Sequence, residues 1–339
     1  MKIFLPLVLC GGLFACQPAI TTHNNANTAS APGNLICYDT ALYNIIDSNA
    51  PVRIIADSLT WSEGPLWLEK QQKLLFSDVP ENKIFEWTES NGKQLYLSPS
   101  GFTGSNAGAF RETGSNGLLL DAEGHLVLCQ HGDRRIATMN APIDAPASSF
   151  TTIANQYNGK KFSSPNDCVL SSSGEYYFTD PPYGLKKMDE DPLKETAWNG
   201  VYKIKKDGTV LLLTDSITKP NGIALFPGEK RLLIANSDPE KPNWYVWDIE
   251  GDSLKNGKIF YSAADHPADW KGLPDGCKID SKGNTIASGP GGVYFFNSTG
   301  KILGILRLAN ACSNIALSGN ERTLFVTNHT QVLRIQMKP

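Results

Sequence analysis

Six segments of this 339-residue sequence follow one pattern, and this internal repeat limits the possible folds more than any other feature. Each segment begins with a polar residue, continues as a short apolar run, passes through a turn and ends in a second apolar run. EGPLWLEKQQKLLFSD and NGIALFPGEKRLLIANS are two examples. The polar residues that begin the segments, here called the repeat-start residues, are Glu63, Asn116, Asn166, Asn221, Asp275 and Asn314.

The spacing of the repeats leaves room for four strands in each. The repeat-start residues lie 53, 50, 55, 54 and 39 positions apart. The intervals contain further short runs rich in β-branched and aromatic residues, such as KIFEW and KQLYLS, which are bounded by turn residues. Four short strands per repeat are typical of a propeller blade. The sequence therefore predicts an all-β fold, a six-bladed β-propeller.

The last repeat is incomplete, because it supplies only the strands NIALS, TLFVTN and QVLRIQM. We expect VRIIAD, residues 52–57, to supply the fourth strand of this blade. Closing the ring with an N-terminal strand removes exposed sheet edges, which would otherwise pair with other chains.

The chain begins MKIFLPLVLCGGLFACQPAI, which has the features of an export signal: one lysine, a short apolar stretch and small residues. LFAC resembles the lipobox of bacterial lipoproteins, in which the cysteine becomes diacylated; an ordinary signal peptide that contains a cysteine is the alternative. We predict a signal peptide at residues 1–15, a disordered tether at residues 16–36 that begins with lipidated Cys16, and the propeller at residues 37–339. The expected location is the periplasm, on the outer membrane.

The charge pattern limits the partners. The formal net charge is -3, and acidic and basic residues are interspersed without a basic stripe. Nucleic acid is therefore excluded as a partner, the membrane is reached only through the lipid anchor, and no protein partner is implied.

Equivalent positions of successive blades surround the central channel, so we expect the repeat-start residues to converge at one mouth of it. Asn-Gly and Asp-Gly pairs also form turns, which offers a simpler role for Asn116, Asn221 and Asp275. Glu63 and Asn166 have no such role in a turn. Carboxylate and amide oxygens suit Ca²⁺ better than structural Zn²⁺, and converging carboxylates repel one another without a cation. We predict a divalent cation, Ca²⁺ first, with Mg²⁺, Mn²⁺ or Zn²⁺ as alternatives.

An ordered series of segments resembles the gluconolactonase, SMP-30 and regucalcin-like family of six-bladed propeller hydrolases. The series includes SEGPLW, SNGLLLDAEG, CQHGDRRI, SPNDCVL, FTDPPYG and LPDGCKID, and the resemblance covers about residues 52–337. CQHGDRR and FTDPPYG are most similar to the bacterial gluconolactonase branch. The resemblance implies a metal-dependent hydrolase that acts on a small sugar lactone.

The resemblance also assigns site residues. Glu63, Asn221 and Asp275 match the three protein ligands of the family's cation, and Asn166 matches an asparagine that contacts the ion or the substrate. Animal members have an arginine two residues before that asparagine, whereas this sequence has Ser164. We therefore expect substrate contacts from the loop after the second repeat. The candidate substrate contacts are Asn116, His131, Asp133, Arg135, Asn166 and Tyr183.

Lactone hydrolysis needs a polarised carbonyl, an activated water and a stabilised oxyanion, which a cation at the channel mouth can help to supply. The general base is Asp275 by the family resemblance, or His131, whose unperturbed pKa lies near neutrality. Both remain candidates at this point. Propellers host many functions, so a sugar-acid-binding protein without turnover, and an esterase or phosphotriesterase acting on another substrate, are the alternative functions.

Overall fold

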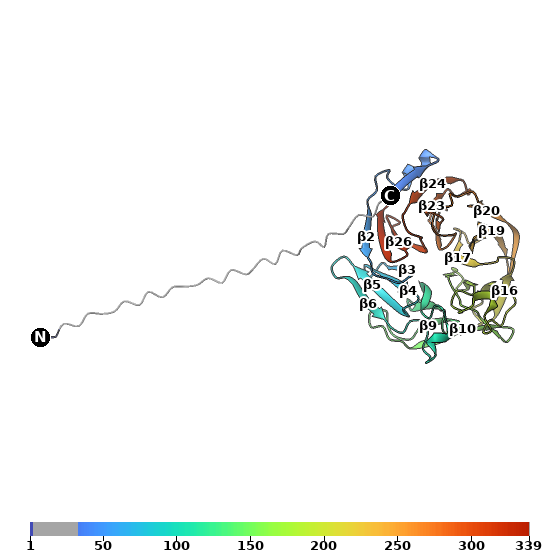
Figure 1. The fold of residues 1–339 in the computed structure, drawn as a ribbon, viewed down its shortest axis with the longest axis horizontal. Helices are drawn as coiled ribbons and strands as arrows, with labels where there is room; N and C mark the ends of the chain where they lie inside the picture. Colours follow the sequence, from blue (N-terminus) through green and yellow to red (C-terminus); the bar gives the residue numbers. More distant parts are fainter. Residues whose placement is uncertain (3–32, 339) are drawn as a thin grey trace.

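The computed structural model describes residues 1–2 and 33–338 and shows six antiparallel sheets arranged as blades around one axis (Figure 1). This arrangement confirms the predicted six-bladed propeller. The first strand of each repeat contacts the first strand of the next blade, and the other strands follow outward in sequence order.

The first three blades each consist of four strands that are consecutive in sequence. Blade 1 contains β3 (Ser62–Leu68), β4 (Lys73–Asp78), β5 (Lys83–Thr88) and β6 (Gly92–Leu97). Blade 2 contains β7 (Ser115–Leu120), β8 (Leu126–Gln130), β9 (Arg135–Met139) and β10 (Phe150–Ala154). Blade 3 contains β13 (Cys168–Leu170), β14 (Tyr176–Asp180), β15 (Gly200–Ile204) and β16 (Val210–Thr214).

The other three blades have the same arrangement, with two additions from the N-terminal part of the chain. Blade 4 contains β17 (Pro220–Leu225), β18 (Arg231–Asp238), β19 (Lys241–Glu250) and β20 (Ser253–Ser262). Blade 5 contains β21 (Cys277–Ile279), β22 (Thr285–Gly289), β23 (Gly292–Phe296) and β24 (Ile302–Arg307). Blade 6 contains β25 (Asn314–Leu317), β26 (Thr323–Asn328) and β27 (Gln331–Gln336).

Two N-terminal strands complete the ring. β2 (Val52–Ala56) pairs with β27, so the N-terminal segment closes blade 6 as predicted. β1 (Asn34–Cys37) pairs with β24 as a fifth strand of blade 5, so residues 34–36 belong to the folded part and not to the tether. The physical reason is that the edge of β24 offers unpaired backbone groups, while Leu35 packs against the core between blades 5 and 6. The predicted signal peptide beyond residue 2, Cys16 and the tether up to residue 32 lie outside the described residues.

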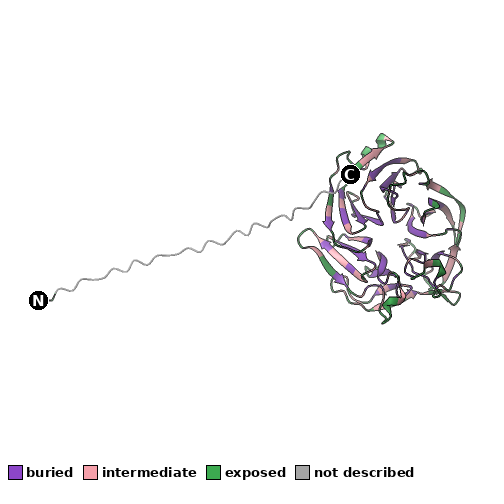
Figure 2. Ribbon diagram, in the orientation of Figure 1, coloured by how far each residue is buried: buried purple, intermediate pink, exposed green. Residues whose placement is uncertain are grey.

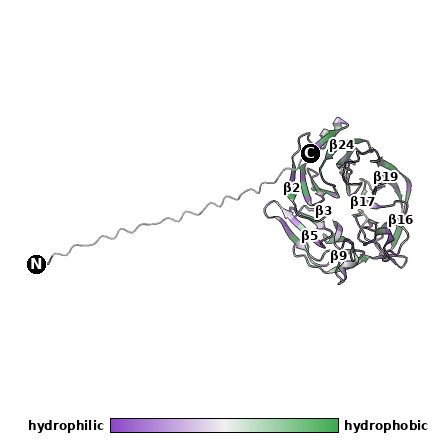
Figure 3. Ribbon diagram, in the orientation of Figure 1, coloured by the Kyte–Doolittle hydropathy of each residue, from purple (hydrophilic) through white to green (hydrophobic). Residues whose placement is uncertain are grey.

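The hydrophobic core consists of six clusters, each lying between two neighbouring blades. Buried residues (Figure 2) and hydrophobic residues (Figure 3) follow the strands of the blades. Successive residues of a strand point to opposite faces, so Leu74 and Phe76 pack toward blade 6 whereas Leu75 packs toward blade 2. Both faces of a blade are buried, which explains continuous apolar runs such as KLLF.

The glycines after the repeat-start residues allow the blades to meet at the axis. Asn116 and Asn221 lie in strands β7 and β17, so their Asn-Gly pairs do not form turns. A Cβ atom on Gly222 would lie 2.2 Å from the carbonyl oxygen of Asp275 in the next blade. The pairing register shifts near the start of both strands, which is how a β-bulge redirects a side chain. Asn116 and Asn221 therefore face the channel and do not form turns.

Side-chain hydroxyl groups connect neighbouring blades at several places around the ring. Ser77 on β4 donates to the carbonyl oxygen of Asn116 at 2.9 Å. Ser313 donates to the carbonyl oxygen of Ser62 at 2.5 Å and thereby joins the last blade to the first. These bonds fix the positions of the inner strands relative to one another.

The remaining elements are short. The described residues contain no α-helix but three 3-10 helices, η1 (Thr40–Asn44), η2 (Ala107–Ala109) and η3 (Met188–Glu190), and a small hairpin of β11 (Gln156–Tyr157) and β12 (Lys160–Lys161). In this part of the chain no helix has the length and apolar character needed to cross a membrane.

Candidate metal centre and substrate cavity

A cavity of about 520 Å³ lies at the end of the channel where the inner strands begin. Five of the six repeat-start residues line it: Glu63, Asn116, Asn166, Asn221 and Asp275. Asn314 is engaged elsewhere, because its Nδ2 donates to Asp167 Oδ2 at 3.4 Å. The structure therefore brings together all four residues proposed from the sequence as metal ligands.

The lining residues contain buried oxygen atoms that no protein group satisfies. Four side-chain oxygens of the repeat-start residues have no hydrogen-bond partner within the described part of the chain: Asn116 Oδ1, Asn166 Oδ1, Asn221 Oδ1 and Asp275 Oδ1. A buried acceptor without a partner costs about 1–3 kcal/mol. Together with the Glu63 carboxylate, these atoms form a set of hard oxygen donors, which is the set that Ca²⁺ prefers. The residues present therefore fit a divalent cation.

The carboxyl groups of the cavity also favour a cation. Burial raises the pKa of Glu63 to about 8, and the negative charge of Asp167 contributes to this rise. Burial and the charge of Glu63 raise the pKa of Asp275 well above its usual value. A nearby positive charge favours the ionised form of both groups and would reverse these shifts.

Two long loops form one wall of the cavity, namely residues 98–114 between β6 and β7 and residues 181–199 between β14 and β15. They contact each other through an isolated β-bridge between Phe110 and Leu185 and through a bond of 3.0 Å from the backbone N–H of Arg111 to the carbonyl oxygen of Gly184. The loops bring Arg111, Glu112 and Tyr183 to the cavity. Of these three residues, only Tyr183 was predicted from the sequence.

Ser164, at the position where animal members have an arginine, holds the second loop in place. Its side chain is fully buried, and its Oγ donates to the carbonyl oxygen of Pro181 at 2.6 Å. The same oxygen accepts a bond from the backbone N–H of Gly184 at 2.9 Å. Tyr183 lies between these two residues, and its buried hydroxyl has no hydrogen-bond partner among the described residues. Ser164 therefore fixes the backbone on both sides of Tyr183.

His131 lies behind this wall and is fully buried. Its Nδ1 is 3.3 Å from Glu112 Oε2, although neither ring nitrogen has a hydrogen bond of good geometry within the described residues. Glu112, and not His131, lines the cavity. The expectation that His131 contacts substrate therefore does not agree with its position, because the loop that contains Glu112 covers it.

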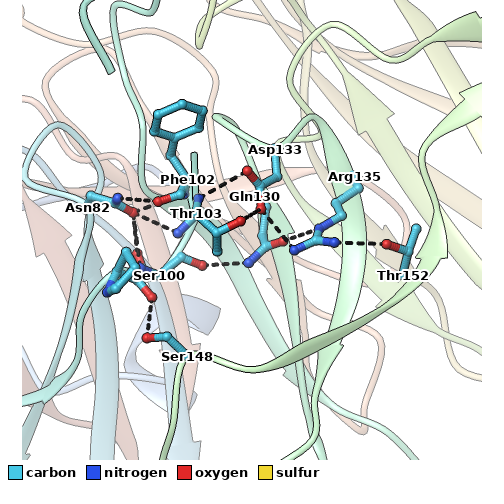
Figure 4. Close-up of polar contacts among 11 residues, drawn as sticks. Asn82, Ser100, Phe102, Thr103, Gln130, Asp133, Arg135, Ser148 and Thr152 are labelled. Carbon is cyan, nitrogen blue, oxygen red and sulfur yellow. Dashed lines mark hydrogen bonds and ion pairs between the residues drawn. The ribbon is translucent and has the colours of Figure 1, made fainter. Parts of the chain in front are cut away.

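Asp133 and Arg135 lie away from the cavity and support the first loop (Figure 4). Their side chains form an ion pair of 2.8 Å. Asp133 accepts a bond from the Thr103 hydroxyl, and Arg135 donates to Gln130 and Thr152. The structure does not support the expected substrate contacts from this pair, because protein groups already satisfy both charges.

Ser237 on β18 lines the cavity and was missed by sequence analysis. Its Oγ accepts a hydrogen bond of 2.9 Å from Asn221 Nδ2. The sequence does place a polar residue at or near the end of the second strand of each repeat. It does not show which of these polar residues reaches the cavity.

Comparisons with known proteins agree on one family. Residues 61–330 match the family model described as SMP-30/Gluconolactonase/LRE-like region. A gluconolactonase of Zymomonas mobilis is 36% identical over 321 residues, which cover 93% of this chain and 89% of that protein. The structure is similar to that of a Xanthomonas campestris gluconolactonase, with a TM-score of 0.77, 27% identity and coverage of 91% and 97% of the two chains. A calcium-binding regucalcin of Agrobacterium tumefaciens shares the fold, with a TM-score of 0.64, 16% identity and coverage of 84% and 94%.

Proposed function

The chain belongs to the SMP-30/gluconolactonase/LRE-like family, and from this premise we propose that it hydrolyses sugar lactones with the help of a divalent cation. The observation that supports a cation is the convergence of unpartnered oxygens, among the described residues, at the channel mouth. The residues that would hold the ion are Glu63, Asn166, Asn221 and Asp275.

Calcium is the cation that the donor set favours, because all of these donors are carboxylate or amide oxygens. The regucalcin of Agrobacterium tumefaciens, which shares the fold, is described as a calcium-binding protein. When bound, such an ion polarises a carbonyl oxygen and lowers the pKa of water.

The protein residues at the cavity bind the lactone and take up a proton. Asp275 Oδ1 lines the cavity without a donor in the described chain and can therefore accept the proton of the attacking water. We assign the general base to Asp275 and not to His131, because Glu112 separates His131 from the cavity. Asn116 and the Tyr183 hydroxyl would hold the lactone oxygens.

The test is proton release from D-glucono-1,5-lactone at constant pH, with purified protein stripped by a chelator and then given Ca²⁺, Mg²⁺, Mn²⁺ or Zn²⁺. We expect turnover to stop with chelator, to return with Ca²⁺, and to be lost in Asp275→Asn. Asp269→Asn changes an exposed carboxylate a few residues earlier and should leave turnover unchanged.

Two other outcomes would change the proposal. Cation binding without turnover on a panel of lactones would favour a protein that binds sugar acids without catalysis. Lactone turnover that persists in chelator would contradict the dependence on a metal. The protein would then be a lactonase that needs no cation.

We further propose that the protein is exported and lipid-anchored at Cys16, on the basis of the N-terminal sequence. Labelling with a radioactive fatty acid should mark the wild-type protein and not Cys16→Ser. Equal labelling of both would contradict the anchor.

A further inference from the structure

Glu112 is an acidic residue of the cavity wall that the proposed chemistry does not use. It lies in the loop of residues 98–114, where the bond from Arg111 to Gly184 fixes the backbone next to it. Its side chain is 13% exposed and lines the same cavity as Asn116 and Tyr183. A carboxylate in such a place loses most of its hydration, so hydrogen bonds or ion pairs must compensate for the lost water.

Two cationic or polar neighbours hold the Glu112 side chain. The guanidinium of Arg111 lies 3.7 Å from Oε1, and the Arg111 side chain is about half exposed. His131 Nδ1 lies 3.3 Å from Oε2 on the buried side. Neither contact uses up the carboxylate, because two oxygens offer about four acceptor positions.

His131 has little freedom to turn elsewhere. Its backbone N–H donates to the carbonyl oxygen of Gly114 at 3.1 Å. The chain at Gly184 packs on it so closely that a Cβ there would lie 2.9 Å from His131 Cβ. Its two ring nitrogens are buried without a hydrogen-bond partner in the described residues, so a bond to Glu112 is the contact available to satisfy Nδ1. His131 therefore lies directly behind Glu112, with Nδ1 placed within reach of its carboxylate.

An ionised carboxylate only accepts hydrogen bonds, and two adjacent hydroxyl groups of a sugar ring can donate to its two oxygens. Bonds to a charged acceptor are stronger than bonds between neutral groups. A cavity that contains such an acceptor discriminates against a ligand without hydroxyl groups, because the carboxylate then stays desolvated and unpaired.

We infer that Glu112 is a specificity-determining residue that accepts hydrogen bonds from the ring hydroxyls of a polyhydroxylated lactone, and that His131 is a positioning residue for Glu112. The inference rests on the proposed function where it concerns a lactone. Whether Glu112 binds the hydroxyl groups of a sugar can be measured without hydrolysis of a lactone.

The first experiment compares kcat/KM for D-glucono-1,5-lactone with kcat/KM for δ-valerolactone, which has the same ring without hydroxyl groups. Glu112→Gln should lower the ratio of these two values about 10-fold or more, mainly through KM for the hydroxylated substrate. The matched control is Glu190→Gln, because Glu190 is an exposed carboxylate of the neighbouring loop and should leave the ratio unchanged.

The second experiment measures binding of D-glucose, a pyranose with hydroxyl groups and no ester, by calorimetry in the presence of Ca²⁺. Glu112→Gln should raise Kd about 10-fold, again with Glu190→Gln as the control. If the wild-type protein hydrolyses neither lactone, the proposed function fails, but a Glu112-dependent affinity for glucose still supports the hydroxyl-binding role. An unchanged selectivity ratio together with an unchanged or undetectable affinity for glucose overturns the inference.

The role of His131 has its own readout. His131→Gln should raise KM for D-glucono-1,5-lactone while kcat and Ca²⁺ affinity stay close to those of the wild-type protein. An equal loss of kcat on both lactones would instead assign His131 to the proton transfer and contradict the positioning role.

Discussion

Asn221 donates a hydrogen bond from its side-chain Nδ2 to the Oγ of Ser237, 2.9 Å away, and this bond fixes which end of the amide faces the cavity. The Ser237 hydroxyl donates its own hydrogen to the carbonyl oxygen of Pro274 at 2.6 Å. A hydroxyl has one hydrogen, so Ser237 can only accept at Asn221. The amide oxygen of Asn221 is thereby left toward the cavity, without a partner in the described chain.

Ser237→Ala should weaken binding of the proposed cation about 10-fold to 100-fold, because residues that orient a ligand usually have effects of this size. Calorimetric titration with Ca²⁺ measures the change. Ser77→Ala removes an equivalent hydroxyl of blade 1, which bonds the backbone oxygen of Asn116 and no side-chain oxygen of a proposed ligand, and it should leave the affinity unchanged. Equal affinities of Ser237→Ala and the wild-type protein would show that Asn221 does not bind the ion.

Stability without a cation should fall as pH rises from about 5 to 8. The pKa of Glu63 is raised from 4.5 to about 8, so in this window the unfolded chain releases a proton that the folded chain retains. Because a cation favours ionised Glu63, the gain in Tm on adding Ca²⁺ should grow over the same range. Thermal melts in chelator and in Ca²⁺ measure both trends. Glu63→Gln should flatten the first trend and abolish the second, and a slope unaffected by this change would contradict the assignment.

Gly222→Ala should destabilise the fold by about 1–3 kcal/mol, because the new Cβ would lie 2.2 Å from the carbonyl oxygen of Asp275 and the inner strands would have to separate. Chemical denaturation measures the loss. Gly108→Ala is the control, since Gly108 is exposed and its nearest neighbouring atom lies 4.0 Å from the Cβ position. If Gly222→Ala left the free energy of unfolding unchanged, the blades would not meet this closely at the axis.

Tyr183→Phe should lower kcat/KM for the hydrolysed lactone about 10-fold while Tm and Ca²⁺ affinity stay unchanged. The reason is that the Tyr183 hydroxyl has no partner in the described protein, so its removal breaks no internal bond. Steady-state kinetics with paired melts test this prediction. Tyr157→Phe, in the β11–β12 hairpin, should behave as the wild-type protein in both assays. A loss of stability without a loss of activity would assign Tyr183 a purely structural role.

The repeat pattern alone predicted the six blades, the closing strand β2 and the convergence of Glu63, Asn116, Asn166, Asn221 and Asp275. This was possible because strand alternation and turn residues are local properties, and a fixed period places equivalent residues at equivalent positions around one axis. The sequence could not, however, decide whether Asn221 forms part of a turn or faces the channel. The bulge in β17 and the contact of Gly222 with the next blade decided it.

The cavity wall formed by the loops of residues 98–114 and 181–199 was decided only by the tertiary structure. Glu112 reaches the cavity because its loop pairs with Gly184, more than seventy residues later in the chain, and such a contact has no local signature. For the same reason, the sequence could not show that Asp133 and Arg135 form an ion pair beneath a loop, since a satisfied charge and a substrate-binding charge have the same local pattern. Periodic strands therefore determined the ring and the repeat-start residues that meet at the channel mouth, whereas contacts between distant loops determined which other groups line the cavity.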